Sequence, residues 1–181
     1  MTPYPNLTYD QLPTHYQHPK LISWINDTQS TTKRLRLEVP QLSFRLLMAN
    51  TVIASEQEAH LLQLPANTAC WGRQILFRSE QQGFLFSSVL IPPNTCKASG
   101  DQLTKLGANP LGDLLFRQPH QRQQCGISLL RHPDPLLQTA ERYIVDSLEH
   151  TLVRHSICHF RGEPLLIHDV FLPRFIDFIL C

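Results

Sequence analysis

An arginine stands on the face of a predicted strand that should be apolar. Residues 71–78 (WGRQILFR) are rich in aromatic and β-branched residues and predict a strand on which Arg73 shares one face with Trp71, Ile75 and Phe77. A guanidinium group keeps its proton when buried, so Arg73 needs a carboxylate, a phosphate or a ligand as its partner. An internal ion pair with an Asp or Glu is the simpler explanation, and on this strand alone it is the favoured one.

A carboxylate occupies a similar position near the end of the chain. Residues 165–172 predict another strand, on which Asp169 shares a face with Leu165, Ile167 and Phe171. Burial disfavours the charged form of such a carboxyl group, whereas a nearby arginine favours it. The sequence therefore predicts a buried, charged or neutral acid at this position and leaves its ionisation open.

A third candidate group is a backbone amide at a helix start. Asn109 suits a helix cap and Pro110 the first helical position, so the N–H of Leu111 is among the unpaired donors of that helix. An anion binds readily at such a place, and Gly112 would allow it to approach closely. The alternative is an ordinary capped surface helix, which the spacing alone favours.

Four residues resemble metal ligands by type: His150, His155, Cys158 and His159. Residues 153–160 predict a strand, which turns His155 and His159 to one face and Cys158 to the other. The set cannot converge without a bulge. We therefore expect these side chains on the surface of the sheet and no metal site.

The elements that must position these groups are mainly hairpins. The strands 71–78 and 84–91 are joined by a turn at residues 80–83, and the strands 153–160 and 165–172 by a turn at Gly162. Weaker strand patterns cover residues 41–54 and 121–130. Helical patterns begin at Lys20, after the cap residue Ser30, at Glu56 and at Asp101, and residues 136–146 fit either a helix or a strand.

Composition narrows the class of protein. The 181 residues predict one domain, residues 1–181, whose first 19 residues contain four prolines and form an irregular leader. Charged residues make up 17% and the formal net charge is +1, which does not suggest a nucleic-acid or acidic-membrane surface. No apolar run approaches a membrane span, and the five cysteines form no C-x-x-C pair. These features predict a soluble protein of a reducing compartment, the cytoplasm.

Four separated stretches, taken together, resemble the chorismate lyase family. The first combines Trp24 and Asp27 with residues 30–35 (STTKRL), and the last is residues 162–173 (GEPLLIHDVFLP). Between them lie residues 71–77 (WGRQILF) and residues 105–116 (KLGANPLGDLLF). Residues 154–156 (RHS) also resemble a basic-then-serine step before the last strand. The resemblance implies an α+β fold, with helices packed on a single antiparallel sheet and a buried ligand cavity under helical flaps.

The resemblance also implies a ligand site. Arg73 would hold a ring carboxylate, Leu111 would contribute its backbone N–H, and Asp169 stands where a glutamate is usual. Thr31 matches a methionine position in the first flap and would make contact through its backbone. A glycine–arginine pair that is usual on the returning strand of the first hairpin is Ser87-Ser88 here, so a second cationic contact to the substrate would be missing.

The activity that the resemblance implies is a carbon–oxygen lyase reaction. Chorismate would be converted to 4-hydroxybenzoate and pyruvate, with Arg73 and Asp169 as the catalytic pair and with inhibition by the product. The implied role is in ubiquinone or plastoquinone biosynthesis. No cofactor, nucleic-acid partner or membrane insertion is implied, and we expect a monomer. The alternative is a non-catalytic small-ligand-binding domain of the UTRA class, as in GntR-type effector domains.

Overall fold

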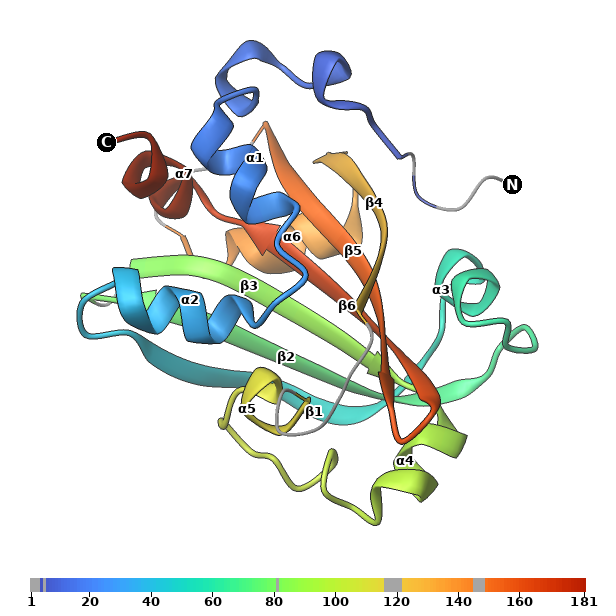
Figure 1. Ribbon diagram of the computed structural model, residues 1–181. Helices are drawn as coiled ribbons and strands as arrows, with labels where there is room; N and C mark the ends of the chain where they lie inside the picture. The colour runs from blue at the N-terminus through green and yellow to red at the C-terminus, as the bar shows by residue number, and fades with distance from the viewer. Residues whose placement is uncertain (1–3, 5, 81, 116–121, 145–148) are drawn as a thin grey trace.

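The protein is built on one six-stranded antiparallel sheet. The computed structural model describes residues 4, 6–80, 82–115, 122–144 and 149–181, without the side chains of residues 124 and 125. Its strands lie in the order β1-β2-β3-β6-β5-β4 (Figure 1). Their bounds are β1 Ser43–Ile53, β2 Ala69–Ser79, β3 Gln82–Ile91, β4 Arg122–Arg131, β5 His150–Phe160 and β6 Glu163–Phe171. Helices pack on this sheet, so the predicted α+β fold is confirmed.

Strand register decides which side chains share a face. Arg73 on β2 lies opposite Val89 on β3, and Ser87 on β3 lies opposite Asp169 on β6. Asp169 in turn lies opposite Arg154 on β5. Directly opposed residues point to the same side of a sheet, as do residues two apart along one strand. One face of the sheet therefore carries Arg73, Ser87, Arg154 and Asp169, and we call it the site face.

Four helices cover the site face. They are α1 Pro19–Ile25, α2 Thr31–Glu38, α5 Leu111–Leu115 and α7 Pro173–Leu180. The helices α1, α2 and α7 bury Trp24, Leu35 and Phe175 against sheet residues such as Ile75 and Phe171. The helix α5 buries Leu111 and Leu115 against the other end of the same face. Figure 1 shows α2 in front of β2 and β3.

The opposite face of the sheet is covered by α3 Glu56–Leu61 and α6 Pro135–Glu141. The helix α6 packs Leu137 and Ala140 against Leu76, Phe86 and Val170. The sheet is thus buried on both sides, which explains why its central strands read as nearly continuous apolar runs.

Two helices were not predicted from the sequence. Prolines 92 and 93 were interpreted as the end of a strand, but Pro93 is also the first residue of α4 Pro93–Ser99, which ends at the left-handed residue Gly100. Pro173 likewise begins α7. The helix expected from Asp101 to Leu106 is wrong, because Asp101 has a positive φ of 67° and turns follow it.

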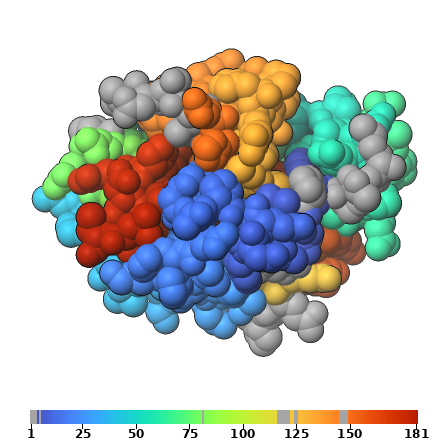
Figure 2. All heavy atoms as spheres, turned by 90° about the horizontal axis from the view of Figure 1, so that it is seen from above, coloured from blue at the N-terminus to red at the C-terminus, as the bar shows by residue number. Residues whose placement is uncertain are grey.

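The remaining helices lie where they were predicted, but α5 begins at Leu111 and not at Pro110. The side chain of Asn109, predicted as the cap, donates instead to the carbonyl oxygen of Leu106 at 3.0 Å. The hydroxyl of Ser30 accepts the N–H of Lys33 at 3.1 Å and caps α2. Residues 136–146, left open between helix and strand, contribute α6. The described residues of the leader contain two 3₁₀ helices, Tyr9–Gln11 and Thr14–Tyr16, and Figure 2 shows the leader beside α1. Within the described residues, no helix is both long and apolar enough to cross a bilayer.

Candidate functional site

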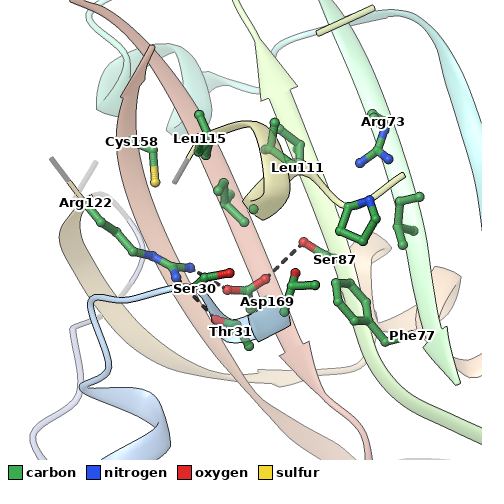
Figure 3. A pocket seen from close by; sticks show the side chains of 16 residues that line it. Ser30, Thr31, Arg73, Phe77, Ser87, Leu111, Leu115, Arg122, Cys158 and Asp169 are labelled. Atoms are coloured by element: carbon green, nitrogen blue, oxygen red, sulfur yellow. Dashed lines mark hydrogen bonds and ion pairs between the residues drawn. The ribbon is translucent and has the colours of Figure 1, made fainter. Parts of the chain in front are cut away.

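A small cavity lies between the site face and the helices α2 and α5. Side chains of β2, β3, β5 and β6 line its floor, and residues of α2 and α5 lie over it (Figure 3). Its volume is about 40 Å³, well below the cavity of about 150 Å³ that holds benzene in an engineered protein core. All four predicted site residues, Thr31, Arg73, Leu111 and Asp169, line this cavity. Admission of an aromatic ring requires the covering helices to move.

Arg73 lies in the cavity wall as a buried cation. It is 3% exposed, and burial lowers the pKa of its guanidinium to about 10, so it stays protonated at neutral pH. Its Nη2 donates to the carbonyl oxygen of Gly107 at 2.9 Å and to that of Asn109. None of the described residues forms an ion pair with it, and its Nε has no acceptor among them. The predicted internal ion pair is therefore absent from the described part of the chain, where β2 places Arg73 under the carbonyl groups of a loop.

Asp169 has the counter-ions that Arg73 lacks. Its Oδ2 accepts from Nη2 of Arg154 and from Nη2 of Arg122, each at 2.7 Å. Its Oδ1 accepts from the hydroxyl of Ser87 at 3.0 Å. Burial alone would raise the pKa of Asp169, but the two arginines lower it more, and the pKa lies below its usual range. Asp169 is a carboxylate at neutral pH and can accept hydrogen bonds, but it is a weak base.

Arg154 and Arg122 hold Asp169 in different ways. Arg154 is 1% exposed, and its Nη1 donates to the carbonyl oxygens of Trp24, Ile25 and Asp27 at 3.0–3.3 Å. It therefore ties the end of α1 to the sheet and does not line the cavity. Arg122, in contrast, lines the cavity and approaches Asp169 from the side opposite Arg73 (Figure 3).

The sequence interpretation did not assign a role to either arginine. The alternation of Arg154 with apolar residues in the strand 153–160 was a usable signal, since it places Arg154 on the face opposite His155. Arg122 gave no such signal, because it begins a weak strand pattern and reaches Asp169 only through the β4–β5–β6 register.

Thr31 belongs to the same polar group. Its Oγ1 accepts from Nη2 of Arg154 at 2.6 Å and from Nη1 of Arg122 at 3.3 Å. The hydroxyl thus faces the arginines at the first residue of α2. The side chain of Thr31 is therefore occupied by the two arginines of the polar group.

The helices α2 and α5 touch over the cavity. A Cβ atom added at Gly112 would lie 2.8 Å from the hydroxyl oxygen of Ser30, so only glycine permits this approach. On the outer surface, Arg36 of α2 and Asp113 of α5 form a two-pronged ion pair with distances of 2.7 and 2.9 Å. The two helices therefore form a joined cover, and α5 is not the ordinary surface helix that the spacing favoured.

A second polar cluster lies on the opposite face of the sheet. Nδ1 of His155 lies 2.7 Å from Nδ1 of His168, and Nε2 of His155 lies 2.7 Å from the hydroxyl of Ser128. The ring of Tyr4 stacks on His155 with a centroid distance of 3.9 Å, and Glu58 lies 3.3 Å from Nε2 of His168. Burial lowers the pKa of His155 to about 2.

The prediction that the His and Cys side chains of the strand 153–160 lie on the sheet surface is wrong for two of them. His155 and Cys158 are both buried, His155 in the cluster and Cys158 in the cavity wall. Strand alternation separates them as expected, but helices and the leader cover both faces. Among the described residues, no group of three or more His, Cys, Asp or Glu side chains is arranged to hold a metal ion.

Ser87 and Ser88 lie on opposite faces. Ser87 contacts Asp169, whereas Ser88 lines a cavity of about 330 Å³ beside His168. A cation at position 88 would therefore point away from the site face. Any second cationic contact in the cavity has to come from another strand.

Two solved structures with a similar fold are domains of PhnF proteins. The effector domain of PhnF from Mycobacterium smegmatis has a TM-score of 0.59 and 10% identity, over 81% of this chain and 90% of that chain. A PhnF C-terminal domain has a TM-score of 0.58 and 17% identity, over 79% and 87% of the two chains. At this level of identity the similarity describes the fold alone.

Sequence comparison gives a more specific result. The chain is 27% identical to a probable chorismate pyruvate-lyase of Thiobacillus denitrificans over 92% of this chain and 90% of that protein. It is 30% identical to a chorismate pyruvate-lyase of Pectobacterium atrosepticum over 83% and 75% of the two chains. The sequence model of one protein family, described as chorismate lyase, matches residues 6–178. The predicted resemblance and the lyase class of enzyme are confirmed: the chain belongs to the chorismate lyase family.

Proposed function

We propose that this protein converts chorismate to 4-hydroxybenzoate and pyruvate. The observation that carries the proposal is Arg73, a buried guanidinium that lines the cavity without a counter-ion among the described residues. A buried cation of this kind is costly unless an anion joins it. The ring carboxylate of chorismate is such an anion, and two similar members of this family are named for that substrate.

The other cavity groups suit the rest of the ring. Asp169 would accept the hydrogen bond of the ring hydroxyl through Oδ1, the oxygen that faces one hydroxyl donor rather than two guanidinium groups. Leu111 would add its backbone N–H at the carboxylate end, and Thr31 its backbone beside Asp169. Apolar residues such as Ile75, Val89 and Ile167 would contact the faces of the ring.

The reaction requires little from the protein in proton chemistry. The ether bond between the ring and the enolpyruvyl group breaks, and its electron pair leaves with the oxygen as the enolate of pyruvate. The hydrogen on the hydroxyl-bearing ring carbon leaves as a proton, and one proton is taken up by the enolate, so the two products together contain the atoms of chorismate. Aromatisation drives the step. The weak basicity of Asp169 fits a role in orienting the hydroxyl, with positioning and electrostatics as the main catalytic contributions.

Product release would limit turnover. The carboxylate, hydroxyl and ring contacts all survive when pyruvate leaves, and the product lies under helices that an ion pair joins. Slow opening of such a cover is a common limit on kcat. We therefore expect inhibition by 4-hydroxybenzoate, and a role in supplying it to quinone biosynthesis.

The experiment is a direct assay of the purified protein. Chorismate is added, pyruvate is followed through lactate dehydrogenase and NADH, and 4-hydroxybenzoate is quantified separately by chromatography. We expect the two products in equal amounts without added metal or cofactor. A protein that only binds a small ligand, as the UTRA alternative predicts, would release no pyruvate above the spontaneous rate.

A further inference from the structure

The charges around the cavity do not balance for a ligand with one carboxylate. Arg73, Arg122 and Arg154 are three guanidinium groups, and Asp169 is the one carboxylate that ion-pairs with any of them among the described residues. The group therefore carries an excess of two positive charges in a buried setting. Buried charge is stable only when it is compensated, so the fitting ligand has two negative charges.

The three arginines are not equivalent as donors to a ligand. The terminal nitrogens of Arg154 donate hydrogen bonds to carbonyl oxygens, to Thr31 and to Asp169. Arg154 does not line the cavity. Arg73 and Arg122 both line the cavity. Nε is buried with no acceptor among the described residues in all three arginines, so the position in the cavity wall is what distinguishes Arg73 and Arg122 from Arg154. These two arginines are therefore the candidates for two anionic groups.

Their positions match the geometry of the proposed substrate. Arg73 would hold the ring carboxylate at one end of the cavity, and Asp169 would accept the hydroxyl. The enolpyruvyl ether stands on the ring carbon next to the hydroxyl-bearing carbon, so its carboxylate falls beside Asp169. Arg122 lies there, with its Nη2 2.7 Å from Oδ2 of Asp169 (Figure 3).

We propose that Arg122 binds the enolpyruvyl carboxylate of the substrate and thereby makes the site selective for a dicarboxylate. This inference rests on the proposed function and extends it to a residue that the sequence interpretation did not assign. Arg122 takes the place, on β4, of the second cationic contact that position 88 cannot provide from the opposite face. When pyruvate leaves, one of the two anionic groups leaves with it, and the charges around the product are again unbalanced.

A rival explanation is that Arg122 only helps Arg154 to neutralise Asp169. That role would affect every ligand whose hydroxyl contacts Asp169, whether or not it has a second carboxylate. Two stable probes separate the explanations. The first is 3-(carboxymethoxy)-4-hydroxybenzoate, which has an ether-linked carboxylate beside the hydroxyl, and the second is 3-methoxy-4-hydroxybenzoate, which has the same ether without the charge.

The test measures the dissociation constants of both probes by calorimetry for the wild type, Arg122→Gln and Arg122→Lys. Arg131→Gln serves as the matched control, because Arg131 is an exposed arginine at the far end of β4. In the wild type we expect the dicarboxylate to bind at least about tenfold more tightly than its methoxy partner, as for a desolvated charge pair. Arg122→Gln should remove this ratio, and Arg131→Gln should keep it.

A ratio that stays the same in Arg122→Gln, or equal losses for both probes, would overturn the assignment. If Arg122→Gln does not fold, the comparison passes to Arg122→Lys, which keeps the charge beside Asp169 but loses the planar fork. There the ratio should fall at least about threefold, and an unchanged ratio again overturns the assignment. Turnover is a separate readout: a wild type that prefers the dicarboxylate through Arg122 but releases no pyruvate would refute the proposed function and leave the Arg122 site standing.

Discussion

Arg73 and Asp169 face one cavity from strands β2 and β6, with β3 between them. Arg73 pairs with Val89 and Asp169 pairs with Ser87, so the two charged residues are offset by two residues along the sheet. The backbone therefore holds the two residues at opposite ends of the cavity. Arg73 has no counter-ion among the described residues, whereas Asp169 has two.

Replacement of Arg73 should separate ligand binding from folding. Arg73→Met removes a buried cation without a counter-ion among the described residues, but it also removes the hydrogen bonds to the carbonyl oxygens of Gly107 and Asn109. These effects oppose each other, so the free energy of unfolding should change little. Binding of 4-hydroxybenzoate should become weaker by about 2–5 kcal/mol, as for the loss of one half of a desolvated charge pair. Turnover of chorismate should fall by a factor that corresponds to a similar free energy. Urea unfolding and calorimetry on the same preparation measure both quantities. A variant that unfolds, or one that keeps full turnover, would show that Arg73 serves the fold.

Asp169 should respond differently, because two arginines depend on it. Asp169→Asn leaves Arg122 and Arg154 without their shared carboxylate, and the loss of one partner of a buried pair costs about 3–5 kcal/mol of stability. Turnover should fall as well. Asp169→Glu keeps the negative charge, and the family resemblance implies a glutamate at this position, so this variant should keep more of the stability and more of the turnover.

The comparison requires turnover to be expressed per folded molecule, with the folded fraction taken from the unfolding curve. If Asp169→Asn turns over chorismate as fast as the wild type on this basis, the carboxylate has no charged role in the reaction. Ser128→Ala is a suitable control for the loss of a buried polar group, because Ser128 contacts His155 on the opposite face of the sheet.

Ligand fragments should report on the two ends of the cavity. A ligand that binds only the folded state at a hundredfold excess over its dissociation constant raises stability by about 2.7 kcal/mol. At equal concentrations, 4-hydroxybenzoate should raise the melting temperature more than benzoate, which lacks the Asp169 contact, or phenol, which lacks the Arg73 contact. Equal shifts from all three ligands, or none from 4-hydroxybenzoate, would count against the site.

The elements that hold the site were largely predictable, but their meeting was not. The strands of Arg73 and Asp169 follow from alternation and turn residues, and Ser30 caps α2 as its residue type predicts. The pairing of β3 with β6 joins residues about eighty positions apart, and no local pattern specifies it. That pairing and the β4–β5–β6 register bring Arg122, Arg154 and Ser87 to Asp169. Local rules therefore predicted single residues of the site, whereas their charge partners required the tertiary fold.

The ion pair between α2 and α5 should control ligand exchange. The cavity of about 40 Å³ cannot admit a ring unless the cover opens, and Arg36 and Asp113 join the two covering helices on the outside. Both side chains are well exposed, at 44% and 36%, so the pair itself contributes only about 0–1 kcal/mol. Asp113→Asn should therefore leave the melting temperature nearly unchanged and raise the dissociation rate of 4-hydroxybenzoate by up to about fivefold.

Stopped-flow displacement of the bound product measures that rate. Raising the salt concentration should have the same effect on the wild type and little effect on Asp113→Asn, because an exposed pair is screened. A similar exposed pair away from the cover, Lys105 with Asp101, provides the control through Asp101→Asn. Dissociation rates that are the same in all three proteins would show that the pair does not hold the cover closed.

His155 should make the protein sensitive to mild acid. Its pKa in the folded state is lowered to about 2 by burial first and by His168 second, whereas an unfolded histidine has a pKa of about 6.5. The unfolded chain therefore binds a proton that the folded chain rejects, and this contribution to stability is complete above pH 6.5 and is lost as the pH falls below it. Between pH 7 and pH 5 the loss should be about 2 kcal/mol.

The pKa values of Asp169 and Glu58 are also lowered, but these carboxyl groups affect stability only at acid pH, near and below the usual pKa of a carboxyl group. They therefore contribute little to the change in stability between pH 7 and pH 5. Urea unfolding at pH 5, 6 and 7 should give a shallower pH dependence for His155→Gln than for the wild type, with His60→Gln as an exposed control. Because Tyr4 stacks on His155, the fluorescence of a Tyr4→Trp variant should report on whether the leader detaches over the same pH range. Equal pH dependence in the wild type and His155→Gln would mean that His155 accepts its proton in the folded state.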